Sequence, residues 1–88
     1  MSRIQIDVTN IQTVRALHVY LAYVLDLPAY YGKNLDALHD VLCERDAAAR
    51  IVLSGKPASE EMAEYLVRLE AVLEDCAQEN AALCFERA

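Results

Sequence analysis

The chain has 88 residues, of which 56% are hydrophobic, and its 14 acidic and 8 basic residues give a formal net charge of −6. This length fits a single domain, residues 1–88, that buries roughly 60% of the surface its unfolded chain would expose. The negative charge disfavours nucleic acid and anionic membranes as direct partners and favours a basic protein. Charge alone does not name that partner, because many cytosolic proteins are mildly acidic only for solubility.

Targeting and redox signals predict a reduced, cytoplasmic protein. The longest uninterrupted apolar run, residues 19–25, is far shorter than the roughly 20 residues that cross a bilayer. The N-terminus lacks the continuous apolar stretch and the small-residue cleavage site of a secretory signal. Cys43, Cys76 and Cys84 are odd in number and include no Cys-x-x-Cys pair, so neither a disulfide framework nor a structural zinc site is expected.

The predicted elements begin with a strand and a helix. Ile4, Ile6 and Val8 alternate with polar residues, which predicts a strand with one buried face. Thr13 can cap a helix whose limit is marked by Pro28. We expect this helix to pack into the core, because its apolar side repeats at helical spacing through Val14, Leu17, His18, Leu21, Val24 and Leu25.

A loop and a second helix follow. Pro28 and Gly32 interrupt residues 27–33, which predicts a loop, and Asn34 stands where a helix N-cap should be. The helix is expected to run to about Cys43. Residues 50–54 then form a run rich in β-branched side chains, bounded by Gly55 and Pro57, which predicts a buried central strand.

The last third of the chain predicts helix and then strand. From Ser59 to about Asn80 the apolar residues repeat at helical spacing, either as one helix or as two that meet near Tyr65. Residues 82–86 are expected to form a third strand. Because helical segments separate the strands, the sequence predicts an α/β fold, a three-stranded parallel sheet packed with three to four helices.

The helix at residues 34–43 has two unlike sides. Leu35, Leu38 and Leu42, with Val41 beside them, line one side and are expected to anchor the helix to the core. A polar stripe is expected to run along the opposite side. Its members fall at positions i, i+3, i+4 and i+7 and are Asp36, His39, Asp40 and Cys43.

The two acids of this stripe differ in how well local structure explains them. Asp36 lies in the first helical turn, where the unpaired backbone N–H groups and the helix dipole favour a carboxylate. Asp40 lies past the midpoint, gains nothing from that dipole, and adds a like-charge repulsion of a few tenths of a kcal/mol. An ordinary solvated helix face is the simplest explanation for such a pair, and it fits Asp36 better than Asp40.

The loop residues Tyr30, Tyr31 and Gly32, which precede this helix, favour a binding surface instead. Exposed tyrosines beside convergent acids are typical of protein interfaces, and Tyr30 and Tyr31 directly precede this helix. Core packing would account for one of the two. Gly32 permits either a helix-preceding bend or the close approach of another chain.

Residues 27–42, which read LPxYYGxNLDALxDxL, resemble the signature segment of the barstar family of intracellular ribonuclease inhibitors. The order of elements over all 88 residues also fits that family, whose fold is a three-stranded parallel sheet packed with helices. The resemblance implies an inhibitor rather than an enzyme, with no cofactor or metal. Its acidic helix and Tyr-Tyr-Gly loop would plug the active site of a small basic ribonuclease, where substrate phosphate would bind.

The resemblance also implies roles for individual residues. Asp40 would be the principal anchor for arginines and a catalytic histidine of the enzyme, with Asp36 as a second carboxylate and Tyr30 stacked at the rim. An acid near the end of the last helix commonly joins this interface; Asp75 matches it best, with Glu74 and Glu79 as competitors. The expected contact residues are Tyr30, Gly32, Asn34, Leu35, Asp36, His39, Asp40, Cys43 and Asp75.

The chain departs from the family pattern at the helix. His39 stands where the family's well-known member has tryptophan, and residues 43–45 read Cys-Glu-Arg where threonine, glycine and an aromatic residue are expected. Arg45 places a positive charge in a region meant to meet a basic partner. The cognate enzyme is therefore expected to differ from barnase itself.

Other functions are compatible with parts of the pattern. Metal binding by Asp36, His39, Asp40 and Cys43 is disfavoured, because sites on one helix usually need ligands from another element. Catalysis is disfavoured because the sequence has no glycine-rich phosphate loop, nucleophile elbow or triad. An immunity or adaptor protein for a basic toxin that is not a ribonuclease stays open. Within the ribonuclease hypothesis, a secreted enzyme and a delivered toxin domain both stay open.

Overall fold

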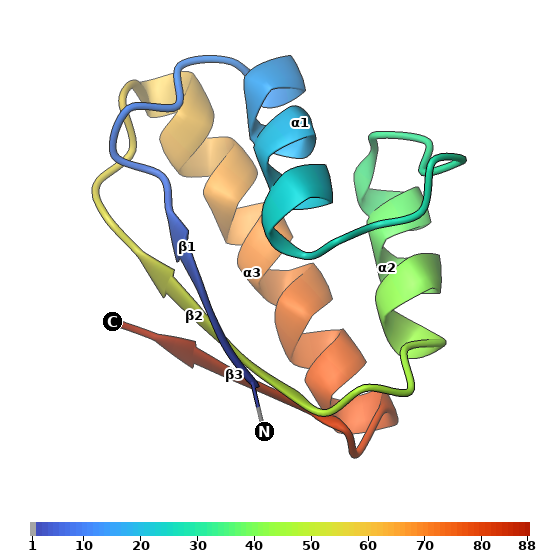
Figure 1. Ribbon diagram of the computed structural model, residues 1–88. Coiled ribbons are helices and arrows are strands. Elements are labelled where there is room, and N and C mark those ends of the chain that lie inside the picture. The colour runs from blue at the N-terminus through green and yellow to red at the C-terminus, as the bar shows by residue number, and fades with distance from the viewer. Residues whose placement is uncertain (1) are drawn as a thin grey trace.

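A computed structural model describes residues 2–88 and shows a sheet covered on one face by helices (Figure 1). The elements are β1 (Ser2–Asp7), α1 (Val14–Val24), α2 (Leu35–Cys43), β2 (Ala49–Ser54), α3 (Glu60–Glu79) and β3 (Leu83–Arg87). The strand order is β1-β2-β3, and both strand pairs are parallel. This confirms the predicted α/β fold with three parallel strands. No helix within residues 2–88 has the length and apolar character needed to span a membrane.

The sheet has one buried and one open face. On the helix side, Ile4 pairs with Ile51 and Ile6 with Leu53, and the β2 residues of these pairs are at most 2% exposed. The open face carries an ion pair between Arg50 of β2 and Glu86 of β3. The prediction that β2 is the central, buried strand is confirmed.

Each helix begins at a residue whose side chain caps it. The side-chain oxygens of the three N-cap residues accept hydrogen bonds from backbone N–H groups three positions later, which satisfies donors that have no partner inside the helix. The donor-to-acceptor distances are 3.0 Å at Thr13, 2.8 Å at Asn34 and 3.2 Å at Ser59. Both the Thr13 and the Asn34 caps agree with the sequence prediction.

The end of α1 and the continuity of α3 depend on more than local signals. α1 ends at Val24, before Pro28, and the chain turns at Asp26 with a φ of 53°. α3 is one continuous helix of 20 residues with no break at Tyr65, so residues 2–88 contain three helices, the lower number expected. Its apolar stripe stays in register along the whole helix through Met62, Leu66, Leu69, Leu73 and Cys76, all of which are buried.

Candidate functional site

The acidic helix α2 is held by its leucines and packs against α3. Leu35, Leu38 and Leu42 are 8%, 0% and 0% exposed, which confirms them as core anchors. Asp36 and Asp40 lie on the exposed side of α2. Within residues 2–88, neither carboxylate takes part in an ion pair. α2 therefore presents two carboxylates that have no ion-pair partner in the described part of the chain.

The other two members of the predicted polar stripe turn toward α3. His39 Nε2 lies 3.6 Å from Glu79 Oε2, and Cys43 Sγ lies 3.2 Å from the same oxygen. Cys43 Sγ is also 3.5 Å from Cys76 Sγ. The four residues share one side of α2, but His39 and Cys43 are partly buried at the edge that meets α3, so only Asp36 and Asp40 are fully exposed.

The two tyrosines before α2 have opposite environments. Tyr30 is 80% exposed, whereas Tyr31 is 6% exposed and packs in the core. The Tyr31 hydroxyl lies 2.5 Å from Nδ1 of the buried His18, whose Nε2 lies 2.6 Å from the Tyr65 hydroxyl. Only Tyr30 is thus available to a partner, and Tyr31 joins the loop to α1 and α3.

This buried network is electrically neutral for a physical reason. Burial lowers the pKa of His18, because a charged imidazolium would lose its hydration. Burial, together with the neighbouring Tyr65, raises the pKa of Tyr31 to about 12. A neutral imidazole can accept from one tyrosine and donate to the other. The sequence predicted a buried His18 but carried no signal for its partners, which lie 13 and 47 positions away.

Gly32 is not required by the conformation of the loop. The left-handed backbone in this loop belongs to Lys33, with a φ of 57°, and not to Gly32. A Cβ atom added at Gly32 would lie 3.4 Å from Cβ of Ala37 and 3.5 Å from the Asn34 amide nitrogen, which are ordinary contacts. Nothing inside the described chain therefore demands glycine at this exposed position.

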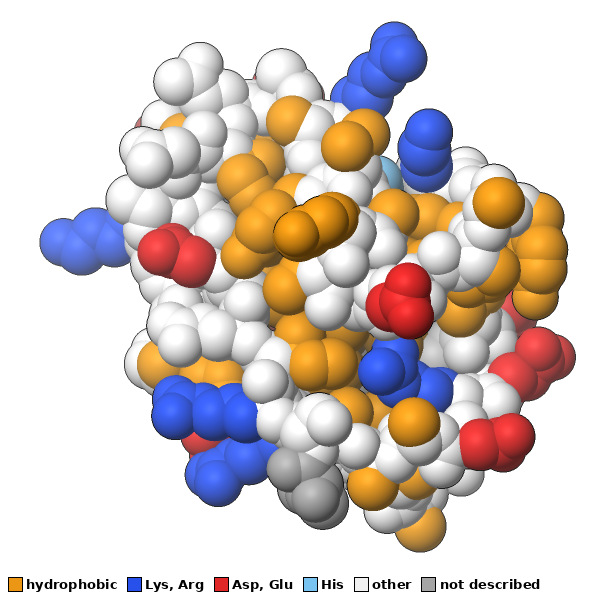
Figure 2. All heavy atoms as spheres, viewed as in Figure 1, with side chains coloured by type: hydrophobic (Ala, Val, Ile, Leu, Met, Phe, Trp, Pro, Cys, Tyr) orange, Lys and Arg blue, Asp and Glu red, His pale blue; other side chains and the backbone are white. Residues whose placement is uncertain are grey.

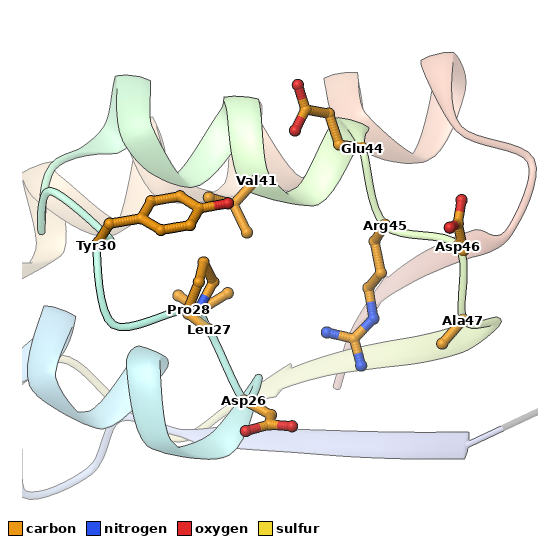
Figure 3. Close-up of a pocket in the computed structure, with 9 residues that line it drawn as sticks. All are labelled: Asp26, Leu27, Pro28, Tyr30, Val41, Glu44, Arg45, Asp46 and Ala47. Carbon is orange, nitrogen blue, oxygen red and sulfur yellow. The ribbon is translucent and has the colours of Figure 1, made fainter.

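A hollow of about 350 Å³ lies between the loop and the last turn of α2 (Figure 3). The Tyr30 ring lies beside Val41 at one end, and the Arg45 guanidinium points into the hollow toward the end of α1. Arg45 Nη1 donates a hydrogen bond of 2.7 Å to the Leu25 carbonyl, where α1 has no basic residue of its own. The Arg45 charge thus stabilises the C-terminal end of α1, where the helix dipole is negative. The side chain does not project from α2 toward a partner.

The remaining predicted contact residues, Asn34, Leu35 and Asp75, differ in their exposure. Asn34 is exposed and its side chain caps α2, whereas Leu35 supports the helix from the core. Asp75 is exposed on α3, one turn before Glu79. Of the three acids considered near the end of α3, Glu79 is the one that contacts α2. Contact of Asp75 with a partner stays a prediction.

The surface around α2 is acidic. Figure 2 shows acidic side chains along the side of the molecule that carries α2 and the segment after it, with apolar groups beside them. Bare carboxylates on a convex helix suit the recognition of cationic groups, whereas general acid–base catalysis needs a concave site that tunes a pKa. The fold and this surface define a small parallel α/β domain with an exposed acidic helix.

Comparison with known proteins names the family. A family model described as "Barstar (barnase inhibitor)" matches residues 1–86, and the chain belongs to this family. It is also similar to a Bacillus subtilis (strain 168) protein named "Putative ribonuclease inhibitor YrdF", with 48% identity over 42 residues. That match covers 48% of this chain and 46% of the relative, about half the length of each.

Proposed function

We propose that this protein inhibits a small basic ribonuclease by placing α2 and the exposed Tyr30 in the enzyme's active site. The observation that carries this proposal is the pair Asp36 and Asp40, exposed on one helix and without an ion-pair partner within residues 2–88. Membership of the barnase-inhibitor family supports the same function. The partner class is an extracellular-type ribonuclease or a ribonuclease toxin domain, met in the cytoplasm.

Inhibition on this proposal is occlusion, with no chemical step carried out by the inhibitor. A ribonuclease binds substrate phosphate with cationic side chains, and carboxylates offer the same charge to the same donors. Asp40 is the principal anchor and Asp36 the second carboxylate, nearer the start of α2. Tyr30 contributes apolar area at the rim, next to the hollow lined by Val41 and Arg45.

Titration into ribonuclease assays tests this function. Small basic bacterial ribonucleases, barnase among them, are mixed with increasing amounts of the protein while RNA hydrolysis is followed. We expect complete loss of activity at a 1:1 ratio for a cognate enzyme, and an association rate that falls steeply with added salt, because the formal charge of −6 steers the encounter. Tight binding of a basic toxin without ribonuclease activity, and inhibition of no ribonuclease, would favour the immunity or adaptor alternative.

Gly32→Ala should separate folding from binding. Its Cβ atom fits the loop at ordinary contact distances, and alanine restricts the unfolded chain, so stability is expected to stay unchanged or to rise by about 0.4–1 kcal/mol. Affinity for the ribonuclease should fall, because the added methyl group keeps the enzyme from approaching the backbone closely. Thermal unfolding and the inhibition constant measure the two effects. An unchanged inhibition constant would remove Gly32 from the contact surface.

A further inference from the structure

Four side chains from α2 and α3 bring a nitrogen, two sulfurs and an oxygen into one cluster. His39 and Cys43 come from α2 at i and i+4, and Cys76 and Glu79 come from α3 at i and i+3, so each helix directs two groups to the shared interface. The ligand atoms of His39, Cys43 and Cys76 all lie within 4.8 Å of one another. Glu79 Oε2 lies next to His39 and Cys43 and would supply a fourth ligand atom.

Four of the six separations within this cluster are close to those around a tetrahedral ion. With bonds of about 2.3 Å to sulfur and about 2.0–2.2 Å to nitrogen and oxygen, the ligand atoms of tetrahedral Zn²⁺ lie roughly 3.3–3.8 Å apart. In the structure, the sulfur atoms lie 3.5 Å apart, Cys43 Sγ lies 3.7 Å from His39 Nε2, and His39 Nε2 lies 3.6 Å from Glu79 Oε2, while the 3.2 Å between Cys43 Sγ and Glu79 Oε2 is slightly shorter than this range. We infer that His39, Cys43, Cys76 and Glu79 form a binding site for Zn²⁺ or a similar thiophilic divalent cation.

The donor set also fits this class of ion. Two thiolates and one imidazole are ligands that zinc prefers over magnesium or calcium, and the carboxylate completes four-coordination. Cys76 is fully buried and Cys43 is partly buried, which shields the sulfur ligands from solvent. Cys84, the third cysteine, is exposed on β3 and lies outside the cluster.

Protons compete with the metal at this site. Burial raises the pKa of both thiols, that of Cys76 to about 12. The contact with Glu79 raises the pKa of Cys43 further, whereas the contact between the two thiols raises the pKa of Cys76 and lowers that of Cys43. Because the cysteines bind as thiolates, Zn²⁺ must displace two protons. We therefore expect affinity to rise steeply with pH and binding to release about two protons.

The consequence of binding is a bridge between two helices. The ion would join the last two turns of α2 to the last turns of α3 and fix the His39 ring against α3. Since a ligand of the native state stabilises it by mass action, Zn²⁺ should raise the melting temperature, and the rise should grow with the logarithm of the Zn²⁺ concentration. This inference concerns the folded chain alone and does not depend on the ribonuclease.

The test uses Zn²⁺ and Co²⁺ on the full chain, kept reduced with a non-chelating phosphine. We expect one Zn²⁺ per chain and a higher melting temperature that a chelator reverses. Co²⁺ in the same site should give the intense visible bands of a tetrahedral ion and the near-ultraviolet absorption of thiolate-to-cobalt charge transfer. Zn²⁺ should displace the Co²⁺ and abolish both signals.

Variants decide whether the four residues hold the ion. Cys43→Ser should weaken Zn²⁺ binding more than about 100-fold, because even the loss of a group that only hydrogen-bonds to a ligand costs about 10- to 100-fold. Glu79→Gln, at the more exposed ligand, should weaken it less. Cys84→Ser is the matched control and should bind as the unmodified chain does.

Because Cys76 is buried, Cys76→Ser is compared only after circular dichroism shows that it is folded, and Cys43→Ser carries the test otherwise. Charge-transfer absorption and Co²⁺ affinity that are unchanged in Cys43→Ser, or absorption that disappears with Cys84→Ser, would overturn the site. So would the absence of saturable Co²⁺ binding to the reduced chain.

Discussion

Asp40→Ala should raise the dissociation constant for the cognate ribonuclease at least roughly 30-fold, which corresponds to ~2 kcal/mol of binding free energy. The side chain is exposed, and within residues 2–88 it pairs with no cation, so its loss leaves nothing unpaired inside the fold. Removing its repulsion with Asp36 should even raise the free energy of unfolding by a few tenths of a kcal/mol. Calorimetric titration and thermal unfolding measure the two quantities.

A second acid separates contact from overall charge. Glu64→Ala removes the same charge from an exposed position in the first half of α3, away from α2. It should slow association slightly through weaker steering while leaving the dissociation rate unchanged. Equal effects of Asp40→Ala and Glu64→Ala would show that only net charge matters and would refute α2 as the binding element.

His18→Phe should lower the free energy of unfolding by about 2 kcal/mol or more. The imidazole bonds two tyrosine hydroxyls, at 2.5 Å to Tyr31 and 2.6 Å to Tyr65, and phenylalanine can bond neither. A buried polar group left without its partner costs about 1–3 kcal/mol. Urea-induced unfolding near neutral pH measures the loss, and Tyr65→Phe, which removes only the half-buried hydroxyl, should cost less.

The same network predicts a pH dependence of stability. Burial lowers the folded-state pKa of His18 below its ordinary value near 6.5, so between the two values the unfolded chain binds more protons than the folded one. Stability therefore rises with pH in this window. His18 contributes fully above about pH 6.5, and its contribution declines as the pH falls toward the folded-state pKa.

Unfolding free energies at about pH 5 and about pH 7.5 test this sign. The unmodified chain should be less stable at the lower pH, and His18→Phe should show a smaller difference. His39→Gln controls for the other histidine, which is half-exposed beside Glu79. A His18→Phe variant that keeps the full pH difference would show that other groups cause it.

Local sequence patterns were enough to predict the architecture. Alternating apolar residues placed β1, a β-branched run placed β2 as the buried central strand, and Thr13 and Asn34 marked where α1 and α2 begin. These signals are local because side-chain spacing and capping act within a few residues. The same helical spacing placed the leucines of α2 in the core and left Asp36 and Asp40 exposed.

Tertiary packing decided which neighbouring residues reach the surface. Tyr30 and Tyr31 are adjacent and chemically identical, yet only Tyr31 meets His18, so Tyr30 alone is free for a partner. Helical periodicity also could not show that Arg45 turns to the end of α1.

The sequence by itself therefore determined the acidic helix α2. The tertiary structure decided which residues of other elements lie against it. Cys43 and Cys76 are 33 positions apart, and their contact depends on how α2 lies against α3. That placement follows from buried side chains contributed by both helices. Periodicity within one helix shows which side is buried, but it carries no information about which residues of another helix that side will meet.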